Sequence, residues 1–285
     1  MDAPQGHEKN ADQIAYWNGP GGQRWVDRQA SQDILLRPVV DLLIDRARIT
    51  PGEQILDIGC GSGATSRAFA ERTGRTGHVT AVDISAPMLA RARELAPPDA
   101  PIDFILADAT VHPFPPDRFD LLASRFGVMF FADPAISFTN MHRAMRRTGR
   151  VTFACWREPR ENPFFMVPLQ AVYRHVPKMP PVGPDEPGPF AFASAERVRR
   201  ILTAAGFSGI AMEPCNLSFD MAIGQGLEAA VKSGIQMGPA SRALTDQPAE
   251  IVAAATQSVR DALAPYAKGP SVPLDGAIWI VTAKA

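Results

Sequence analysis

Short apolar segments alternate with helical patterns along the first half of the chain, and this alternation limits the possible folds more than any other feature. Segments rich in Val, Ile and Leu predict strands over residues 54–59, 78–84, 102–109, 119–126 and 149–156. Their nearly continuous apolar character indicates burial on both faces, as in a parallel sheet covered by helices. The sequence therefore predicts an α/β fold with a doubly wound, mostly parallel sheet.

Helix signals fill the intervals between these strands. Ser62, Ser85 and Asp133 stand at helix starts, which predicts helices over 62–73, 85–96 and 133–146. An earlier helical pattern over 32–49 contains Pro38, which is expected to kink or split the helix.

The alternation stops after residue 156. Residues 157–192 are rich in proline, which predicts an extended or irregular insertion. The remaining pattern predicts a helix over 194–207, a strand over 208–221, a mostly helical segment over 226–267 and a last strand over 276–284. We therefore expect one α/β domain with two inserted pieces.

Composition excludes several classes of protein. The formal net charge of −1 argues against binding of nucleic acid through bulk electrostatics. The three cysteines, Cys60, Cys155 and Cys215, lie far apart, so neither a disulfide framework nor a metal site is predicted. No apolar segment is long enough to span a bilayer, and the N-terminal residues are polar, so a cytoplasmic location is expected.

The segment LDIGCGSGATS, residues 56–66, ends the first predicted strand in glycines and continues directly into a helix. Glycines there let backbone N–H groups and the positive start of the helix approach a ligand closely. The spacing alone is ambiguous. Gly59, Gly61 and Ala64 fit the dinucleotide fingerprint, Gly59, Gly61 and Gly63 fit a tighter pattern, and a plain strand-to-helix turn would also use glycine.

Acidic residues at the ends of three successive strands favour one of these alternatives. Asp57, Asp83 and Asp108 should meet in one crevice, because the carboxyl ends of parallel strands share an edge of the sheet. Asp57 lies two residues before Gly59, where a negative charge disfavours a pyrophosphate and suits a cationic ligand. Asp83 is placed to accept hydrogen bonds from ribose hydroxyls, although it could instead cap the following helix.

These segments resemble the class I S-adenosylmethionine-dependent methyltransferases, specifically the small-molecule branch that includes the ubiquinone/menaquinone biosynthesis methyltransferases. The resemblance rests on ILDIGCGSG, VTAVDIS, ILADAT, FPPDRFDLLASRF and GRVTFACW, which follow in this order from about residue 50 to residue 156. It implies a Rossmann-like, seven-stranded sheet whose last two strands run antiparallel to each other. It also implies an N-terminal lid with helices over 1–48 and a methyltransferase domain over 49–285, whose insertions 157–192 and 222–270 form a substrate cap.

The resemblance also implies a set of cofactor-binding residues for S-adenosylmethionine. The glycine loop and Asp57 would surround the methionine portion, Asp83 would hold the ribose hydroxyls, and the Ser124 carbonyl would accept from the methionine amine. Ile84 and Met88 would pack near the adenine, whose edge Asp108 and the Ala109 N–H would contact. The full set is Tyr16, Trp17, Trp25, Asp57, Gly59, Gly61, Ser62, Gly63, Asp83, Ile84, Met88, Asp108, Ala109 and Ser124.

The segment YWNGPGGQRW, residues 16–25, is implied to fold over this cofactor. An aromatic face is a favourable partner for a sulfonium, by about 0.5–2 kcal/mol. Arg24 or Arg28 could pair with the methionine carboxylate, and Gly19, Gly21 and Gly22 would supply a hinge. Alternatively, the aromatic residues only pack the first helix onto the sheet.

The acceptor is expected to lie beyond the fourth and fifth strands, among Arg125, Phe126, Met129, Trp156 and His175. The apolar majority suggests a small organic acceptor, while core packing is the competing explanation for Met129. Methyl transfer needs a general base only when the acceptor must lose a proton, and no catalytic residue is assigned. Two alternatives remain open: a nicotinamide-dependent oxidoreductase that uses the same loop, and a noncatalytic S-adenosylmethionine-binding protein.

Overall fold

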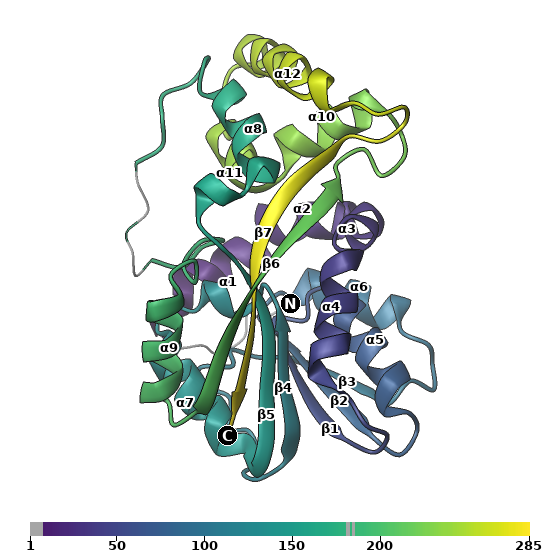
Figure 1. Ribbon diagram of the computed structural model, residues 1–285, viewed down its shortest axis with the longest axis vertical. Coiled ribbons are helices and arrows are strands. Elements are labelled where there is room, and N and C mark those ends of the chain that lie inside the picture. The colour runs from purple at the N-terminus through teal and green to yellow at the C-terminus, as the bar shows by residue number, and fades with distance from the viewer. Residues whose placement is uncertain (1–7, 181–182, 184–185) are drawn as a thin grey trace.

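The computed structural model describes residues 8–180, 183 and 186–285, so the parts of the predicted segments 1–48 and 157–192 that fall on residues 1–7, 181–182 and 184–185 lie outside it. The chain folds around a seven-stranded sheet with the strand order β3-β2-β1-β4-β5-β7-β6 (Figure 1). The strands are β1 Gln54–Ile58, β2 His78–Asp83, β3 Ile102–Leu106, β4 Phe119–Arg125, β5 Met145–Trp156, β6 Ser208–Asp220 and β7 Pro273–Lys284.

Strand direction confirms the predicted topology. Strands β1 to β5 pair in parallel, while β7 pairs antiparallel with both β5 and β6. In the register, Asp57 of β1 lies opposite Ala81 of β2 and Ala123 of β4. The carboxyl ends of the central strands therefore meet at one edge of the sheet, where a ligand can bind.

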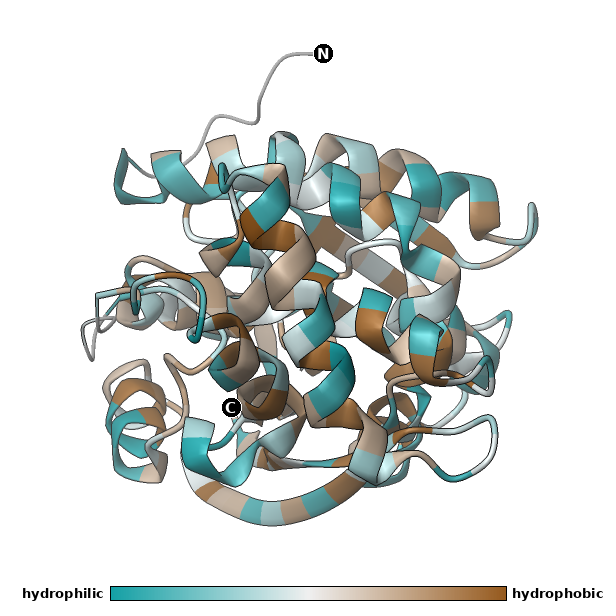
Figure 2. Ribbon diagram, turned by 90° about the horizontal axis from the view of Figure 1, so that it is seen from above, coloured by the Kyte–Doolittle hydropathy of each residue, from teal (hydrophilic) through white to brown (hydrophobic). Residues whose placement is uncertain are grey.

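Helices cover both faces of the sheet, as a doubly wound fold requires. In Figure 1, α4 (Arg37–Ala47), α5 (Ala64–Thr73) and α6 (Ala86–Leu95) lie on one side, and α7 (Pro134–Ala144) and α9 (Ala195–Ala204) lie on the other. Hydrophilic and hydrophobic residues alternate along the helices that Figure 2 shows from above, as expected of helices with one face packed and one in solvent.

Two of the three predicted helix starts are confirmed. Ser85 and Asp133 cap α6 and α7 by accepting backbone N–H bonds, at 3.4 Å from Met88 and 3.2 Å from Ile136. Ser62 was expected to open α5, and this was wrong. The helix begins at Ala64 because the preceding glycine adopts a left-handed backbone with φ +77°.

Three shorter helices precede β1. They are α1 (Ala11–Asn18), α2 (Pro20–Asp27) and α3 (Gln29–Leu35). The predicted split at Pro38 is confirmed, because α3 ends at Leu35 and α4 begins at Arg37, with the proline in its first turn. Proline is tolerated there because its missing N–H has no partner within the helix.

A second layer of helices stands beyond the carboxyl edge of the sheet. Figure 1 shows α8 (Pro163–Val172), α10 (Leu227–Gln236), α11 (Gly238–Ala243) and α12 (Ala249–Leu263) grouped there, with the ends of β6 and β7 reaching into the group. We call these four helices the cap. Single 3-10 turns complete the described structure at Glu8–Asn10, Val128–Phe130, Pro159–Glu161 and Ala264–Tyr266.

The expectation that residues 157–192 are irregular was wrong for α8. Pro163 occupies the first turn, where it is tolerated, and Pro168 lies inside the helix. The cost of the interior proline is offset because α8 buries Phe164 and Leu169 while packing against α12. The helix-breaking tendency of proline is therefore outweighed in α8 by the tertiary packing of its apolar side chains.

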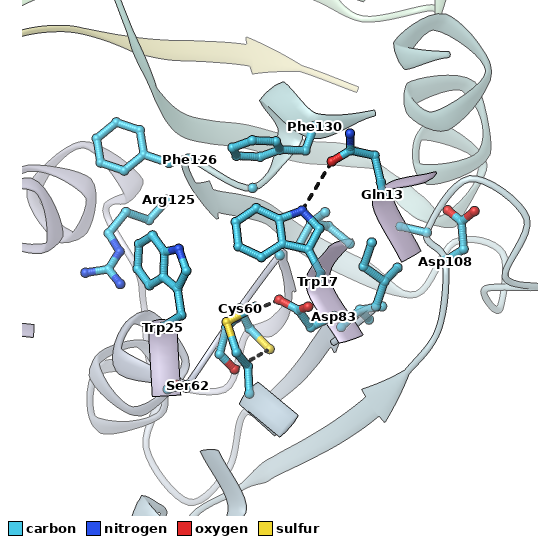
Figure 3. Close-up of a pocket in the computed structure, with 18 of the residues that line it drawn as sticks. Gln13, Trp17, Trp25, Cys60, Ser62, Asp83, Asp108, Arg125, Phe126 and Phe130 are labelled. Atoms are coloured by element: carbon cyan, nitrogen blue, oxygen red, sulfur yellow. Dashed lines mark hydrogen bonds between the residues drawn. The ribbon is translucent and has the colours of Figure 1, made fainter. Parts of the chain in front are cut away.

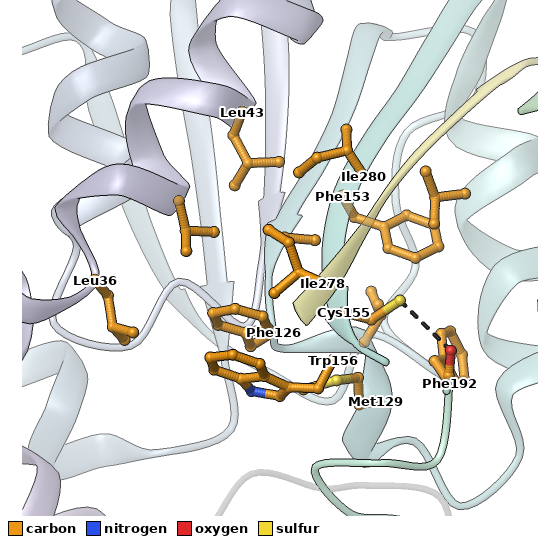
Figure 4. Packing of buried hydrophobic residues seen from close by; sticks show 14 of the residues in the cluster. Leu36, Leu43, Phe126, Met129, Phe153, Cys155, Trp156, Phe192, Ile278 and Ile280 are labelled. Carbon is orange, nitrogen blue, oxygen red and sulfur yellow. Dashed lines mark hydrogen bonds between the residues drawn. The ribbon is translucent and has the colours of Figure 1, made fainter. Parts of the chain in front are cut away.

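Aromatic packing joins the sheet to the cap. Trp156, at the end of β5, stacks on Phe126 with ring centroids 4.4 Å apart and lies 5.8 Å from the Phe164 ring of α8. Figure 4 shows Phe126 and Trp156 side by side at the edge of the apolar cluster. Such pairs add about 0.5–1.5 kcal/mol each beyond their buried area.

No helix in the described part of the chain is long and apolar enough to cross a membrane.

Candidate cofactor and acceptor site

The glycine loop between β1 and α5 has a backbone that only glycine adopts readily. Gly59, Gly61 and Gly63 have φ values of +65°, +56° and +77°. A Cβ atom on Gly59 would lie 2.6 Å from the Cα of Gly127, which follows β4. The chain after β1 and the chain after β4 therefore touch backbone to backbone, and this contact closes one end of a cavity.

Asp83 ties the loop to the end of β2. Its Oδ2 accepts the Gly61 N–H and its Oδ1 accepts the Ser85 N–H, both at 2.8 Å. Burial raises the pKa of Asp83 to about 6, although these backbone hydrogen bonds oppose the shift. The carboxylate is thus fixed in position by the same loop that it faces.

Asp57 has a different place from the one that the family resemblance implies. Its side chain is fully buried, and its Oδ2 accepts from Thr65 Oγ1 and Ser66 Oγ, both at 2.7 Å. Burial raises the pKa of Asp57 to about 6, and these two hydroxyl hydrogen bonds act against the shift. Asp57 therefore holds the first turn of α5 from below the loop and does not line the cavity.

The cavity at this edge contains most of the predicted cofactor residues. Those that line it are Trp17, Trp25, Gly59, Gly61, Ser62, Asp83, Ile84, Met88, Asp108 and Ala109. Tyr16, Gly63 and Ser124 join Asp57 outside the lining. The Ser124 hydroxyl instead donates to the Ile58 carbonyl at 2.7 Å and accepts the Gly127 N–H at 3.1 Å, which fixes β4 against β1.

The N-terminal helices close the cavity from the other side. The Trp17 ring meets the edges of Phe130 and Trp25, with centroid distances of 5.1 and 6.4 Å, and its Nε1 donates to Gln13 at 3.2 Å (Figure 3). Asn18 donates to the Ile84 carbonyl and accepts the Ala86 N–H, so the end of α1 is tied to the start of α6. The aromatic residues both pack onto the domain and line the cavity.

The glycines of this N-terminal segment are packing positions, and their expected role as a hinge is not what the structure shows. A Cβ atom on Gly21 would lie 2.4 Å from the Tyr16 ring, and one on Gly22 would lie 1.9 Å from the Trp17 carbonyl oxygen. Both glycines lie within α2, after the turn at Gly19. They let α2 cross α1 at short range.

Asp108 lies two residues beyond β3, although the sequence placed it at the strand end. It accepts from Asn10 Nδ2 at 2.7 Å and from the Thr110 N–H at 2.8 Å. Asn10 also accepts the Ala132 N–H at 3.0 Å and is itself buried. Sequence reasoning missed Asn10, because nothing local distinguishes it from a surface asparagine.

A second cavity of about 400 Å³ lies between the N-terminal helices, the ends of β4 and β5, and the cap. It shares six lining residues with the first cavity: Gln13, Trp17, Trp25, Gln32, Phe126 and Phe130. Met129 and Trp156 line it as well, together with Phe164 and Phe165 of the cap. The two cavities therefore adjoin across shared aromatic walls.

Two residues expected at the acceptor lie elsewhere. Arg125 lines the first cavity and not the second. His175 lines neither cavity, and its Nε2 lies 2.7 Å from Ser258 Oγ. The polar residues Gln13, Gln29, Gln32 and Asp33 of α1 and α3 line the first cavity and were not predicted from the sequence.

Neither arginine predicted for the methionine carboxylate reaches the first cavity. Arg24 donates to the Tyr16 hydroxyl at 3.2 Å and lines the second cavity only, while Arg28 bonds to Ser233 and Gln236 of α10. No group of three or more His, Cys, Asp or Glu side chains that could hold a metal ion occurs within residues 8–180, 183 and 186–285.

Comparison with known proteins agrees with this geometry. Residues 56–153 match the methyltransferase domain family model. The chain is 29% identical over 158 residues to the demethylmenaquinone methyltransferase of Renibacterium salmoninarum. This alignment covers 55% of this chain and 64% of that protein. It is 35% identical over 109 residues to the ubiquinone/menaquinone biosynthesis C-methyltransferase of Paraburkholderia xenovorans, which covers 38% of this chain and 45% of that protein.

A solved structure shares the fold. The phosphoethanolamine N-methyltransferase 2 of Haemonchus contortus, solved in complex with S-adenosyl-L-methionine, superposes with a TM-score of 0.51 at 20% identity, over 87% of this chain and 52% of that one. The alignments with the two curated relatives span only about half to two thirds of their length. The predicted resemblance to class I methyltransferases and the predicted fold are confirmed.

Proposed function

We propose that this chain, whose residues 56–153 form a methyltransferase domain, transfers a methyl group from S-adenosylmethionine to a small, mostly apolar organic acceptor. The observation that carries the proposal is the junction of two cavities across shared aromatic walls. One is built on the glycine loop and Asp83, and the other is apolar and roofed by the cap. A reaction between two bound molecules needs such adjacency.

The residues of the first cavity fit this cofactor. Asp83 is held by backbone N–H groups with acceptor capacity left for ribose hydroxyls, and the loop backbone at Gly61 faces the same space. Trp17 and Trp25 present aromatic surface suited to a sulfonium. The relatives are methyltransferases, so the oxidoreductase alternative has no support.

When bound, S-adenosylmethionine supplies an electrophilic methyl group: the acceptor's electron pair forms the new bond to carbon, and the carbon–sulfur pair returns to the sulfur. The chain's own contribution is to align the two molecules and to exclude water. The buried stack of Phe126 on Trp156 forms part of the acceptor wall and serves both purposes.

The acceptor cavity favours a nucleophile that needs no strong base. Among its described lining residues, Asp12, Tyr16, Arg24 and Arg242 are titratable, and they come from α1, α2 and α11. Asp12 is exposed to solvent. We therefore favour acceptors that are already reactive, such as electron-rich aromatic rings with a hydroxyl group.

We further propose a cytoplasmic protein that does not act on nucleic acid, given its net charge of −1.

The test has a binding step and a turnover step. Calorimetry with S-adenosylmethionine, S-adenosylhomocysteine and NADH should show binding of the two sulfur nucleosides only. Asp83→Ala should weaken that binding by about 10–100-fold, from the loss of hydrogen bonds to a charged group. The control Asp103→Ala, at an exposed carboxylate on β3 that bonds to His78, should leave binding unchanged.

Turnover is then measured as transfer of a labelled methyl group to hydroquinones, phenols, amines and thiols. Transfer to an apolar acceptor supports the proposal. Binding of the nucleosides without transfer to any acceptor supports the noncatalytic alternative, and tighter binding of NADH contradicts the proposal outright.

A further inference from the structure

Arg125 is a half-buried cation for which no hydrogen bond to another described residue is found. It is the last residue of β4, its guanidinium lines the first cavity (Figure 3), and its Nη1 has no hydrogen-bond partner in the described part of the chain. Burial lowers the pKa of Arg125. A buried donor without a hydrogen-bond partner is unfavourable, so its position at a binding cavity indicates a ligand that accepts from it.

One carboxylate oxygen of each acid near Arg125 is committed to other partners, while Asp57 Oδ1 is buried without a hydrogen bond among the described residues. Asp33 and Asp57 attract it and Arg67 repels it. Asp33 accepts from Gln29 at 2.5 Å and from Arg67 at 3.2 Å, while the bonded oxygen of Asp57 faces two hydroxyl groups of α5. These acids balance the charge of Arg125 from a distance and leave its donor free.

An unpartnered acceptor lines the same cavity. The Gln32 side chain on α3 is 6% exposed, and its Oε1 is buried without a hydrogen-bond partner among the described residues. Gln32 and Arg125 both line the first cavity, and Asp33, the next residue on α3, is within electrostatic reach of Arg125. The cavity therefore offers one charged donor and one carbonyl acceptor, both unmet.

From this pair we infer that Arg125 binds the carboxylate of the cofactor's methionine portion and that the Gln32 carbonyl accepts a hydrogen bond from its ammonium group. An amino-acid zwitterion supplies the missing acceptor and the missing donor together. Arg24 and Arg28 are excluded from this role by their contacts with Tyr16 and with α10. The inference rests on the proposed function, because it concerns the same cofactor.

The experiment compares two thioether nucleosides by calorimetry: S-adenosylhomocysteine and its decarboxylated analogue, 5′-deoxy-5′-(3-aminopropylthio)adenosine. The unaltered protein should bind S-adenosylhomocysteine more tightly. Arg125→Met should weaken S-adenosylhomocysteine by about 10–100-fold, the range for charge-assisted hydrogen bonds, and should change the affinity of the analogue by less than about threefold. Arg125→Lys should retain part of the preference, because it keeps the charge without the planar fork.

The matched control is Arg28→Met, which lines neither cavity and should leave both affinities unchanged. A third nucleoside tests Gln32: the S-adenosylhomocysteine analogue in which hydrogen replaces the amino group. Gln32→Met should weaken the binding of S-adenosylhomocysteine and leave the affinity for this third nucleoside unchanged. Equal loss of both nucleosides in Arg125→Met and Arg125→Lys would overturn the inference and assign Arg125 a structural role. If the unaltered protein binds neither nucleoside, the proposed function itself fails, and that outcome is distinct.

Discussion

The contact between Gly59 and Gly127 gives a quantitative prediction. Three single substitutions separate the two ways in which an added Cβ atom causes strain there: a left-handed backbone and a clash with a neighbouring backbone. Gly61 has a positive φ of +56° but no steric clash, since the nearest atom to an added Cβ is Met88 Sδ at 3.7 Å, an ordinary van der Waals contact. Gly127 has an ordinary φ of −76°, but its Cβ would lie 2.7 Å from the Gly59 Cα and 2.7 Å from the Ile58 carbonyl oxygen. Gly59 combines a φ of +65° with a 2.6 Å contact.

The expected costs follow from these two terms. Gly61→Ala should lower the free energy of unfolding by about 1–2 kcal/mol, the cost of a left-handed backbone for a residue with a Cβ. Gly127→Ala should lower it by about 1–3 kcal/mol through overpacking against a backbone that cannot swing away. Gly59→Ala carries both terms and should cost about 2–5 kcal/mol.

Urea unfolding followed by circular dichroism measures all three variants, with unchanged m-values as the condition for comparison. The affinity for S-adenosylhomocysteine, measured on each folded variant, reports whether the end of the cavity has moved. A Gly59→Ala variant within about 0.5 kcal/mol of Gly61→Ala, a spread typical of uncoupled surface changes, would refute the claim that the two backbones touch.

Three further predictions concern buried polar groups. Lowering the pH through about 6 should weaken S-adenosylmethionine binding by up to tenfold per pH unit, because Asp83 takes up a proton and loses acceptor capacity. Asp83→Asn should remove this pH dependence of binding. If the pH dependence persists in that variant, it belongs to Asp57, whose pKa is also about 6. Because burial raises both pKa values above the ordinary 3.8, the folded state holds these protons more tightly, so the two acids contribute more to stability as pH falls from about 6 towards 4. Asn10→Ala should lower the free energy of unfolding by about 2–4 kcal/mol, because it removes the hydrogen bonds to Asp108, Thr110 and the Ala132 N–H. The rate of amide hydrogen exchange should then rise in α1. The control Asn216→Ala loses one exposed hydrogen bond to Arg157 and should have little effect.

The parts of the fold that the sequence predicted correctly are those with a local cause. Apolar strand runs, helix caps at Ser85 and Asp133, and the glycine loop each depend on neighbouring residues, and all appear in the structure. Proline in α8 misled the prediction because the deciding factor, burial against α12, lies about 90 residues along the chain.

The candidate site was predictable only where its residues follow strands. Asp83 belongs to such a pattern, whereas Gln32 and Asn10 act through contacts with segments distant in the sequence. The role of Arg125 had the same obstacle: its position at the end of β4 was visible, but which of the two cavities it lines depends on the packing of segments distant in the sequence, such as α3 with Asp33.

The common walls of the two cavities limit how such a protein can change its acceptor. Under the proposed function, a substitution at Trp17, Trp25, Phe126 or Phe130 alters both cavities at once, so selectivity gained there would come with a change in cofactor affinity. Phe165, Met237 and Pro239 of the cap region border the acceptor cavity alone. Variation during evolution, or in a designed library, can therefore explore new acceptors from the cap while leaving cofactor binding intact.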